Sequence, residues 1–109
     1  MWQGRMDEAS PILEASLEHQ IRLYGQSSRQ VASAYALLSS VRASQGLFEE
    51  AEQFARRALD ICLQTLGEGH HETGYSRTAL ANILIKRGKG AEAEEQLKLS
   101  LVTYEKALP

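Results

Sequence analysis

Several features that define other classes of protein are missing from this chain of 109 residues. Its single cysteine, Cys62, cannot form a disulfide within the chain, which fits a reducing compartment such as the cytoplasm. No apolar run reaches the roughly 20 residues that a membrane-spanning helix needs, and residues 1–5 lack the apolar core of a signal peptide. Twelve basic and fourteen acidic side chains give a net charge of −2, whereas nucleic-acid-binding proteins usually carry a basic excess. These absences predict a cytoplasmic protein that binds neither membranes nor nucleic acids.

Proline is also scarce, because Pro11 and Pro109 are the only two. The stretch 12–108 therefore contains no residue that would interrupt a helix by lacking a backbone N–H, and good helix formers dominate it. Valine, isoleucine and threonine are sparse and do not alternate with polar residues over the length of a strand. The sequence therefore predicts an all-α chain.

Glycines recur at a fixed interval of 21 residues, and Pro109 falls one interval later: Gly4, Gly25, Gly46, Gly67 and Gly88. Glycine commonly ends a helix in the left-handed conformation, so one interval corresponds to one helix and one turn. Two intervals, or 42 residues, then make a helical hairpin. The segments 3–9, 45–51 and 87–93 match in this register without gaps, which indicates a true internal repeat.

The repeat predicts five helices, at residues 7–24, 29–44, 49–66, 72–87 and 91–107. Ser27 and Gln30 have the spacing of a capping box, which supports the start of the second helix. Each helix carries apolar residues at three- and four-residue steps, and a single hairpin cannot bury such a face, so we expect the hairpins to stack into a solenoid. Residues 1–25 are expected to form a partial repeat that begins with the end of an absent helix at Trp2 to Gly4. Residues 26–67 and 68–109 are expected to form complete hairpins.

The segment 45–52, Gln-Gly-Leu-Phe-Glu-Glu-Ala-Glu, followed by Ala58 and Leu59, resembles the turn and second helix of a tetratricopeptide repeat. The 42-residue length, against the usual ~34, and the segment 66–70, Leu-Gly-Glu-Gly-His, resemble the kinesin-light-chain-type variant. Two positions depart from that pattern, because His71 replaces a usual proline and Gly90 replaces an expected aromatic residue. The resemblance implies a right-handed solenoid that binds peptides or helices of other proteins on a concave surface, built from the first helix of each hairpin.

The resemblance also implies the residues of that surface, which lie on the helices at 29–44 and 72–87. The peptide-binding residues that it implies are Ser33 and Ser40 on the former and Tyr75, Thr78, Asn82, Ile85 and Lys86 on the latter. Asn82 is suited to hold a peptide backbone through its amide, Lys86 to meet a carboxylate, and Tyr75 to stack on an apolar side chain. The alternative is that these are ordinary exposed residues, and that the chain is an architectural segment of a larger solenoid with no peptide ligand.

The sequence contains no cluster that supports an enzyme, a metal site or another cofactor. His70, His71 and Glu72 are the most suggestive group, but adjacent histidines point in different directions. We therefore expect a residue of this loop to cap the next helix or pack on its start. Cys62 lies on the apolar stripe beside Leu59, which predicts a small buried hydrophobic residue and not a nucleophile.

Charged side chains occur at four-residue spacing on the helices: Glu52 with Arg56, Arg56 with Asp60, and Glu94 with Lys98. We expect these pairs to lie on solvated faces, where each contributes a few tenths of a kcal/mol.

The two end helices are expected to lack part of their cover. The first helix has no hairpin partner, which leaves part of the face around Met6, Leu13 and Leu17 unpaired. No repeat follows the fifth helix, which carries a group of large apolar residues: Leu97, Leu99, Leu101, Val102 and Tyr104. Solenoids normally need polar caps at their ends, so we expect a homodimer through these helices in addition to a protein or peptide partner.

Overall fold

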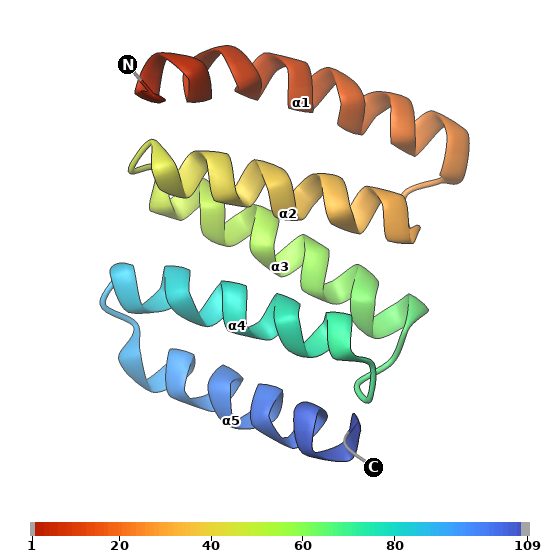
Figure 1. Ribbon diagram of the computed structural model, residues 1–109, viewed down its shortest axis with the longest axis vertical. Helices are drawn as coiled ribbons and strands as arrows, with labels where there is room; N and C mark the ends of the chain where they lie inside the picture. Colours follow the sequence, from red (N-terminus) through yellow and green to blue (C-terminus); the bar gives the residue numbers. More distant parts are fainter. Residues whose placement is uncertain (1, 108–109) are drawn as a thin grey trace.

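The computed structural model describes residues 2–107, all of which belong to helices or to the short turns between them. Five helices follow one another along the stack: α1 (Trp2–Tyr24), α2 (Arg29–Ser44), α3 (Phe48–Thr65), α4 (His71–Lys86) and α5 (Gly90–Ala107) (Figure 1). Each helix packs against its neighbours in the chain, and α2–α3 and α4–α5 form the closest hairpins. The predicted all-α class and the number of helices are therefore confirmed, with boundaries after α1 that differ from the prediction by no more than one residue.

The N-terminal end of the prediction is wrong. Residues Trp2 to Gly4 belong to α1 and not to the end of an earlier helix. The helix runs through Pro11, as the predicted range 7–24 already implied. Glycine inside a helix costs only about 1 kcal/mol relative to alanine, so the 21-residue interval does not by itself stop a helix at Gly4.

Glycines follow the ends of α1, α2, α3 and α4, as predicted. Gly25, Gly46, Gly67 and Gly88 have φ angles of 83°, 80°, 82° and 76°. After α2, the Leu47 N–H donates to the Arg42 carbonyl at 2.8 Å and the Gly46 N–H donates to the Ala43 carbonyl at 3.0 Å. This pair of bonds is the Schellman motif, which satisfies carbonyls that the helix end leaves open and requires a positive φ at the glycine.

Side chains cap the starts of α2 and α4; the first cap differs from the predicted one, and the second agrees with the prediction. Ser28, and not Ser27, caps α2, because Ser28 directly precedes Arg29 with an extended backbone and its Oγ accepts a hydrogen bond from the Val31 N–H at 3.2 Å. At α4, His70 caps the helix through Nδ1, which accepts from the Glu72 N–H at 3.1 Å. The expected capping role of this loop is thus confirmed.

The core consists of two apolar clusters that the hairpins share. The larger cluster joins three helices: Ala51, Ala55 and Leu59 of α3, Leu80, Ala81, Ile83 and Leu84 of α4, and Ala93 of α5. The second cluster joins α2 and α3 through Val31, Ala32, Ile61 and Cys62, and Leu17 and Ile21 of α1 pack on it. Leu17 was expected to lie on an unpaired face, but it is half-buried against this cluster, and Leu13 is half-buried too. Met6 lies outside the residues whose side chains the structure describes. Among the described side chains of α1, residues 11–24, the exposed large apolar ones are Ile12, Leu23 and Tyr24.

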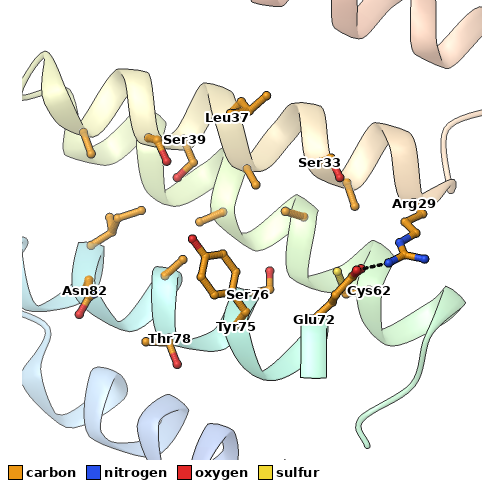
Figure 2. Close-up of a pocket in the computed structure, with 18 of the residues that line it drawn as sticks. Arg29, Ser33, Leu37, Ser39, Cys62, Glu72, Tyr75, Ser76, Thr78 and Asn82 are labelled. Atoms are coloured by element: carbon orange, nitrogen blue, oxygen red, sulfur yellow. Dashed lines mark hydrogen bonds and ion pairs between the residues drawn. The ribbon is translucent and has the colours of Figure 1, made fainter. Parts of the chain in front are cut away.

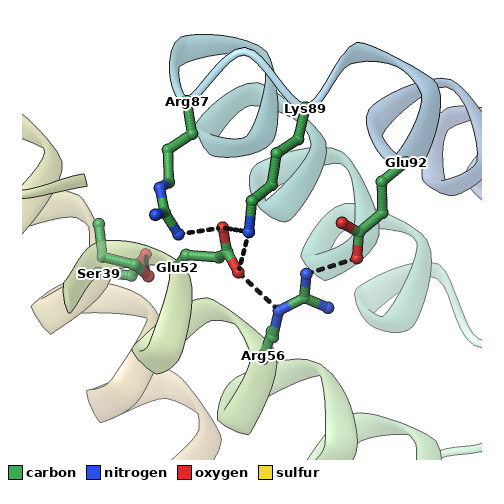
Figure 3. A network of polar contacts seen from close by, with 7 residues as sticks. Ser39, Glu52, Arg56, Arg87, Lys89 and Glu92 are labelled. Carbon is green, nitrogen blue, oxygen red and sulfur yellow. Dashed lines mark hydrogen bonds and ion pairs between the residues drawn. The ribbon is translucent and has the colours of Figure 1, made fainter. Parts of the chain in front are cut away.

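A buried carboxylate connects the two hairpins (Figure 3). Glu52 of α3 is only 7% exposed and accepts from Arg87 Nη1 at 2.9 Å, from Lys89 Nζ at 3.1 Å and from Arg56 Nε at 3.0 Å. Arg56 in turn donates to Glu92 of α5 at 2.5 Å. The expectation of a solvated face at Glu52 is therefore wrong, because the end of α4 covers it.

These contacts determine the protonation of Glu52. Burial alone would raise the pKa of its carboxyl, but the hydrogen bonds from Arg56, Lys89 and Arg87 outweigh burial and lower the pKa to about 2. The carboxylate therefore stays ionised throughout the physiological range.

The other predicted charge pairs have separate outcomes. Glu94 and Lys98 form their pair at 3.3 Å on an exposed face, as predicted. Asp60 is exposed, and among the residues that the structure describes Arg56 pairs with Glu52 and Glu92 instead.

Candidate functional site

A groove with a volume of about 790 Å³ lies between α2 and α4, and α3 forms its floor (Figure 2). We call it the α2–α4 groove. Its floor is built from Ala55, Ala58 and Cys62, and its α2 wall includes Ala32, Ser33, Ala36, Ser40 and Ala43. These small side chains recur at three- and four-residue steps, so one face of each helix carries little bulk and the helices leave space between them.

Six of the seven predicted site residues line this groove: Ser33, Ser40, Tyr75, Thr78, Asn82 and Lys86. Ile85 does not line it, although it is an exposed residue of α4. The predicted residues other than Ile85 therefore lie along one groove, and their role in binding a peptide stays a prediction.

The lining residues differ in what they offer a ligand. Tyr75 is 70% exposed, and its ring lies over the groove (Figure 2). Lys86 is exposed and its Nζ lies 5.9 Å from the centre of the Phe48 ring, close enough for a cation–π contact. The Asn82 side chain is exposed. Tyr75 and Asn82 are therefore open to a ligand, whereas Lys86 would exchange its contact with Phe48 for one with the ligand.

Thr78 is engaged elsewhere. Its Oγ1 lies 2.7 Å from Ser100 Oγ of α5 and 3.1 Å from the Gly74 carbonyl oxygen. The hydroxyl therefore serves the α4–α5 contact, and only the rest of the side chain faces the groove.

An ion pair that the sequence did not predict spans one end of the groove. Arg29, the first residue of α2, pairs with Glu72 in the first turn of α4 (Figure 2). The hydrogen bond from Arg29 lowers the pKa of the Glu72 carboxyl. Extending the predicted stripes by one turn, from Ser33 back to Arg29 and from Tyr75 back to Glu72, would have found both residues.

Cys62 lies on the floor of the groove as a buried residue, as the sequence predicted. Burial raises the pKa of its thiol, and the nearby Glu72 carboxylate raises it further, so the sulfur stays protonated at neutral pH. It contributes apolar surface and not a nucleophile.

The described part of the chain, residues 2–107, holds neither a cluster of metal ligands nor a helix that could span a membrane. No group of three or more His, Cys, Asp or Glu side chains there is placed to hold a metal ion. None of the helices in the same range has the length and apolarity that crossing a lipid bilayer would require.

Comparison with known proteins identifies the family. The model of the tetratricopeptide repeat matches residues 1–64 and 30–106. A search of curated proteins finds no match. Among solved structures, the fold is similar to that of BtubC (BKLC) from P. vanneervenii, a bacterial kinesin light chain, with a TM-score of 0.87 and 22% identity over 94% of this chain. The chain spans 40% of the length of that protein.

The kinesin-light-chain-type resemblance is thus confirmed at the level of the fold. Tetratricopeptide repeats are generally protein-interaction modules and typically non-catalytic scaffolds. Because the family model matches almost the whole sequence, this chain belongs to the tetratricopeptide repeat family.

Proposed function

We propose that this chain is a protein-binding module whose α2–α4 groove holds a short segment of a partner protein. The observation that carries the proposal is a groove of about 790 Å³ that is lined by small side chains and bordered by exposed polar and aromatic ones. This volume lies within the ~300–1,000 Å³ of typical ligand sites. A peptide or helix with bulky apolar side chains would fill the space that Ala36, Ala43 and Ala58 leave open.

Three side chains supply directional contacts in this proposal. Tyr75 stacks on an apolar side chain of the partner, Asn82 bonds a backbone amide through its donor and its acceptor, and Lys86 pairs with a carboxylate. Ser33 and Ser40 on the opposite wall add hydroxyl groups that accept or donate. Ile85 has no role in this proposal, because it does not line the groove.

The alternative function is that of an architectural segment, which extends a larger solenoid and has no peptide ligand. The exposed apolar residues of α5, such as Leu101, favour a second interaction surface but do not fill the groove. The two functions therefore predict different faces of the molecule for the decisive contact.

A display library of random peptides, selected on the intact chain, tests the proposal. Peptides selected on the wild type should lose binding to Ser40→Trp, which fills the groove, and bind Asn82→Ala about 10-fold or more weakly, as expected when a buried polar group loses its partner. The matched control is Asp60→Ala, an exposed position on the outer side of α3. If no peptide is enriched, or if the enriched peptides bind both groove variants as they bind the wild type, the groove is not the binding site.

A further inference from the structure

The two walls of the α2–α4 groove are held differently at its two ends. Both α2 and α4 pack on α3. At the end where these two helices finish, Ala43 of α2 packs on the same apolar cluster that contains Ile83 and Leu84 of α4. At the end where they begin, Val31 and Ala32 of α2 belong instead to the second cluster, which contains no described residue of α4. At that end, apolar packing therefore couples the two walls indirectly, through α3.

The Arg29–Glu72 ion pair joins the two walls at the end where the helices begin (Figure 2). The neighbouring side chains of the α2 wall are small: Ala32, Ser33 and Ala36. The long side chain of Arg29 reaches across the gap that they leave and bonds the α4 wall directly.

Helix caps fix the backbone beside both members of the pair. Ser28 caps α2 directly before Arg29. At α4, His70 Nδ1 accepts from the backbone N–H of Glu72 itself at 3.1 Å. The pair is nevertheless open to solvent, because the two side chains are 59% and 32% exposed, so it contributes little to the stability of the fold. Its distinctive property is that it links fixed points on two walls.

From this arrangement we infer that the Arg29–Glu72 pair is a clasp that sets the distance between the walls and preorganises the groove for its ligand. The inference rests on the function proposed for the groove, and it assigns a positioning role to two residues that act through the spacing of the walls. A groove that already has the bound spacing need not select it from a wider distribution, and its affinity is higher by that fraction. An exposed ion pair shifts such an equilibrium by up to about fivefold.

The first measurement uses the free chain and needs no ligand. Nitroxide labels at Ser33→Cys and Tyr75→Cys, one on each wall, report the distance between the walls by double electron–electron resonance. Cys62→Ala removes the native thiol from this chain. Glu72→Gln should broaden the distance distribution. The exchanged pair, Arg29→Glu with Glu72→Arg, should restore it, because the clasp then forms with its charges reversed.

The second measurement uses an uncharged ligand, which cannot itself pair with Arg29 or Glu72. The probe is a peptide selected on the wild-type chain from a display library without acidic or basic residues. In fluorescence anisotropy, Glu72→Gln should bind this peptide about two- to fivefold more weakly than the wild type does. Arg29→Glu sets two carboxylates against each other and should weaken binding about tenfold or more, whereas the exchanged pair should bind within about twofold of the wild type.

Salt supplies a further readout that loss of packing would not give. The advantage of the wild type over Glu72→Gln should shrink as NaCl rises from about 0.1 M to 1 M, because the Debye length falls from about 10 Å to 3 Å. Glu94→Gln is the matched control, since it removes one member of an exposed ion pair that lies within α5. This control should change neither the distance distribution nor the affinity.

The clasp would be refuted if the distance distribution of Glu72→Gln matched that of the wild type, or if the exchanged pair failed to restore it. It would also be refuted if the peptide bound Glu72→Gln as well as, or better than, the wild type. A library that yields no peptide would instead count against the function proposed for the groove, and the distances in the free chain would then decide whether the pair holds the walls.

Discussion

Replacing Glu52 with glutamine should strongly destabilise the protein, although the residue does not line the groove. Glutamine keeps the size of the side chain and removes its charge. Arg56, Arg87 and Lys89 would then surround a neutral amide at distances near 3 Å. Three cations would be left without the anion that brings them together, at a site that is mostly shielded from water.

The size of the effect follows from the pKa of Glu52. Its carboxyl has an ordinary pKa of 4.5 and a folded-state pKa of about 2. A difference of that size corresponds to roughly 3 kcal/mol of folding free energy, since each pKa unit is worth about 1.4 kcal/mol. Breaking buried ion pairs costs a similar ~3–5 kcal/mol. For a domain of this size the change should lower Tm by about 10–15 °C.

The pH dependence has a defined sign. Because folding lowers the pKa of Glu52, the stabilisation is fully present above the unfolded-state pKa of 4.5 and is lost as the pH falls toward 2. The difference in unfolding free energy between the wild type and Glu52→Gln should therefore be constant above about pH 5.5, one unit above the unfolded-state pKa of 4.5. Below that pH the difference should shrink.

Urea denaturation followed by far-ultraviolet circular dichroism, repeated over a range of pH, measures these differences. Glu94→Gln is the matched control, because it removes the corresponding charge in the 42-residue register from an exposed side chain and should change the unfolding free energy by less than about 0.5 kcal/mol. The reasoning would be refuted if Glu52→Gln were as stable as this control, or if its deficit did not change with pH.

Three further substitutions test the local structure and the groove. Gly46→Val should destabilise the protein by about 1–2 kcal/mol in thermal unfolding; because no atom lies within 4 Å of the added Cβ, the cost comes from the φ of 80°, and an equal loss is not expected for asparagine, which tolerates this conformation. Ser28→Ala should lower the unfolding free energy by about 1 kcal/mol in urea denaturation, whereas Ser27→Ala should change it very little. The opposite order would mean that Ser27 caps α2, in the capping box with Gln30 that the sequence suggested. Asn82→Ala should leave the unfolding free energy within about 0.5 kcal/mol of the wild type, and a larger loss would mean that Asn82 serves the fold and not a ligand.

Much of the architecture was predictable from the sequence because it depends on local interactions. The glycines that end helices act through their own φ angle and through hydrogen bonds to residues three to five positions earlier, so Gly46 and Gly88 located the ends of α2 and α4. The family resemblance, together with helical spacing, likewise grouped six of the seven predicted site residues along one groove, because residues at three- and four-residue steps share a helix face. The 42-residue register then predicted that the helices pair into hairpins that stack one on the next, since equal repeats pack in equal ways.

Tertiary structure alone decided the properties that depend on residues far apart in the chain. Glu52 and Glu94 occupy the same position of the repeat and each has a basic residue four positions later, yet one is buried and the other exposed. Arg87 and Lys89, 35 and 37 residues from Glu52, reach it because α4 folds back over α3. In the same way, the Arg29–Glu72 pair joins residues 43 positions apart at the end of the groove. Sequence periodicity identifies the face of a helix on which a residue lies, but burial and charge pairing depend on which helix covers that face.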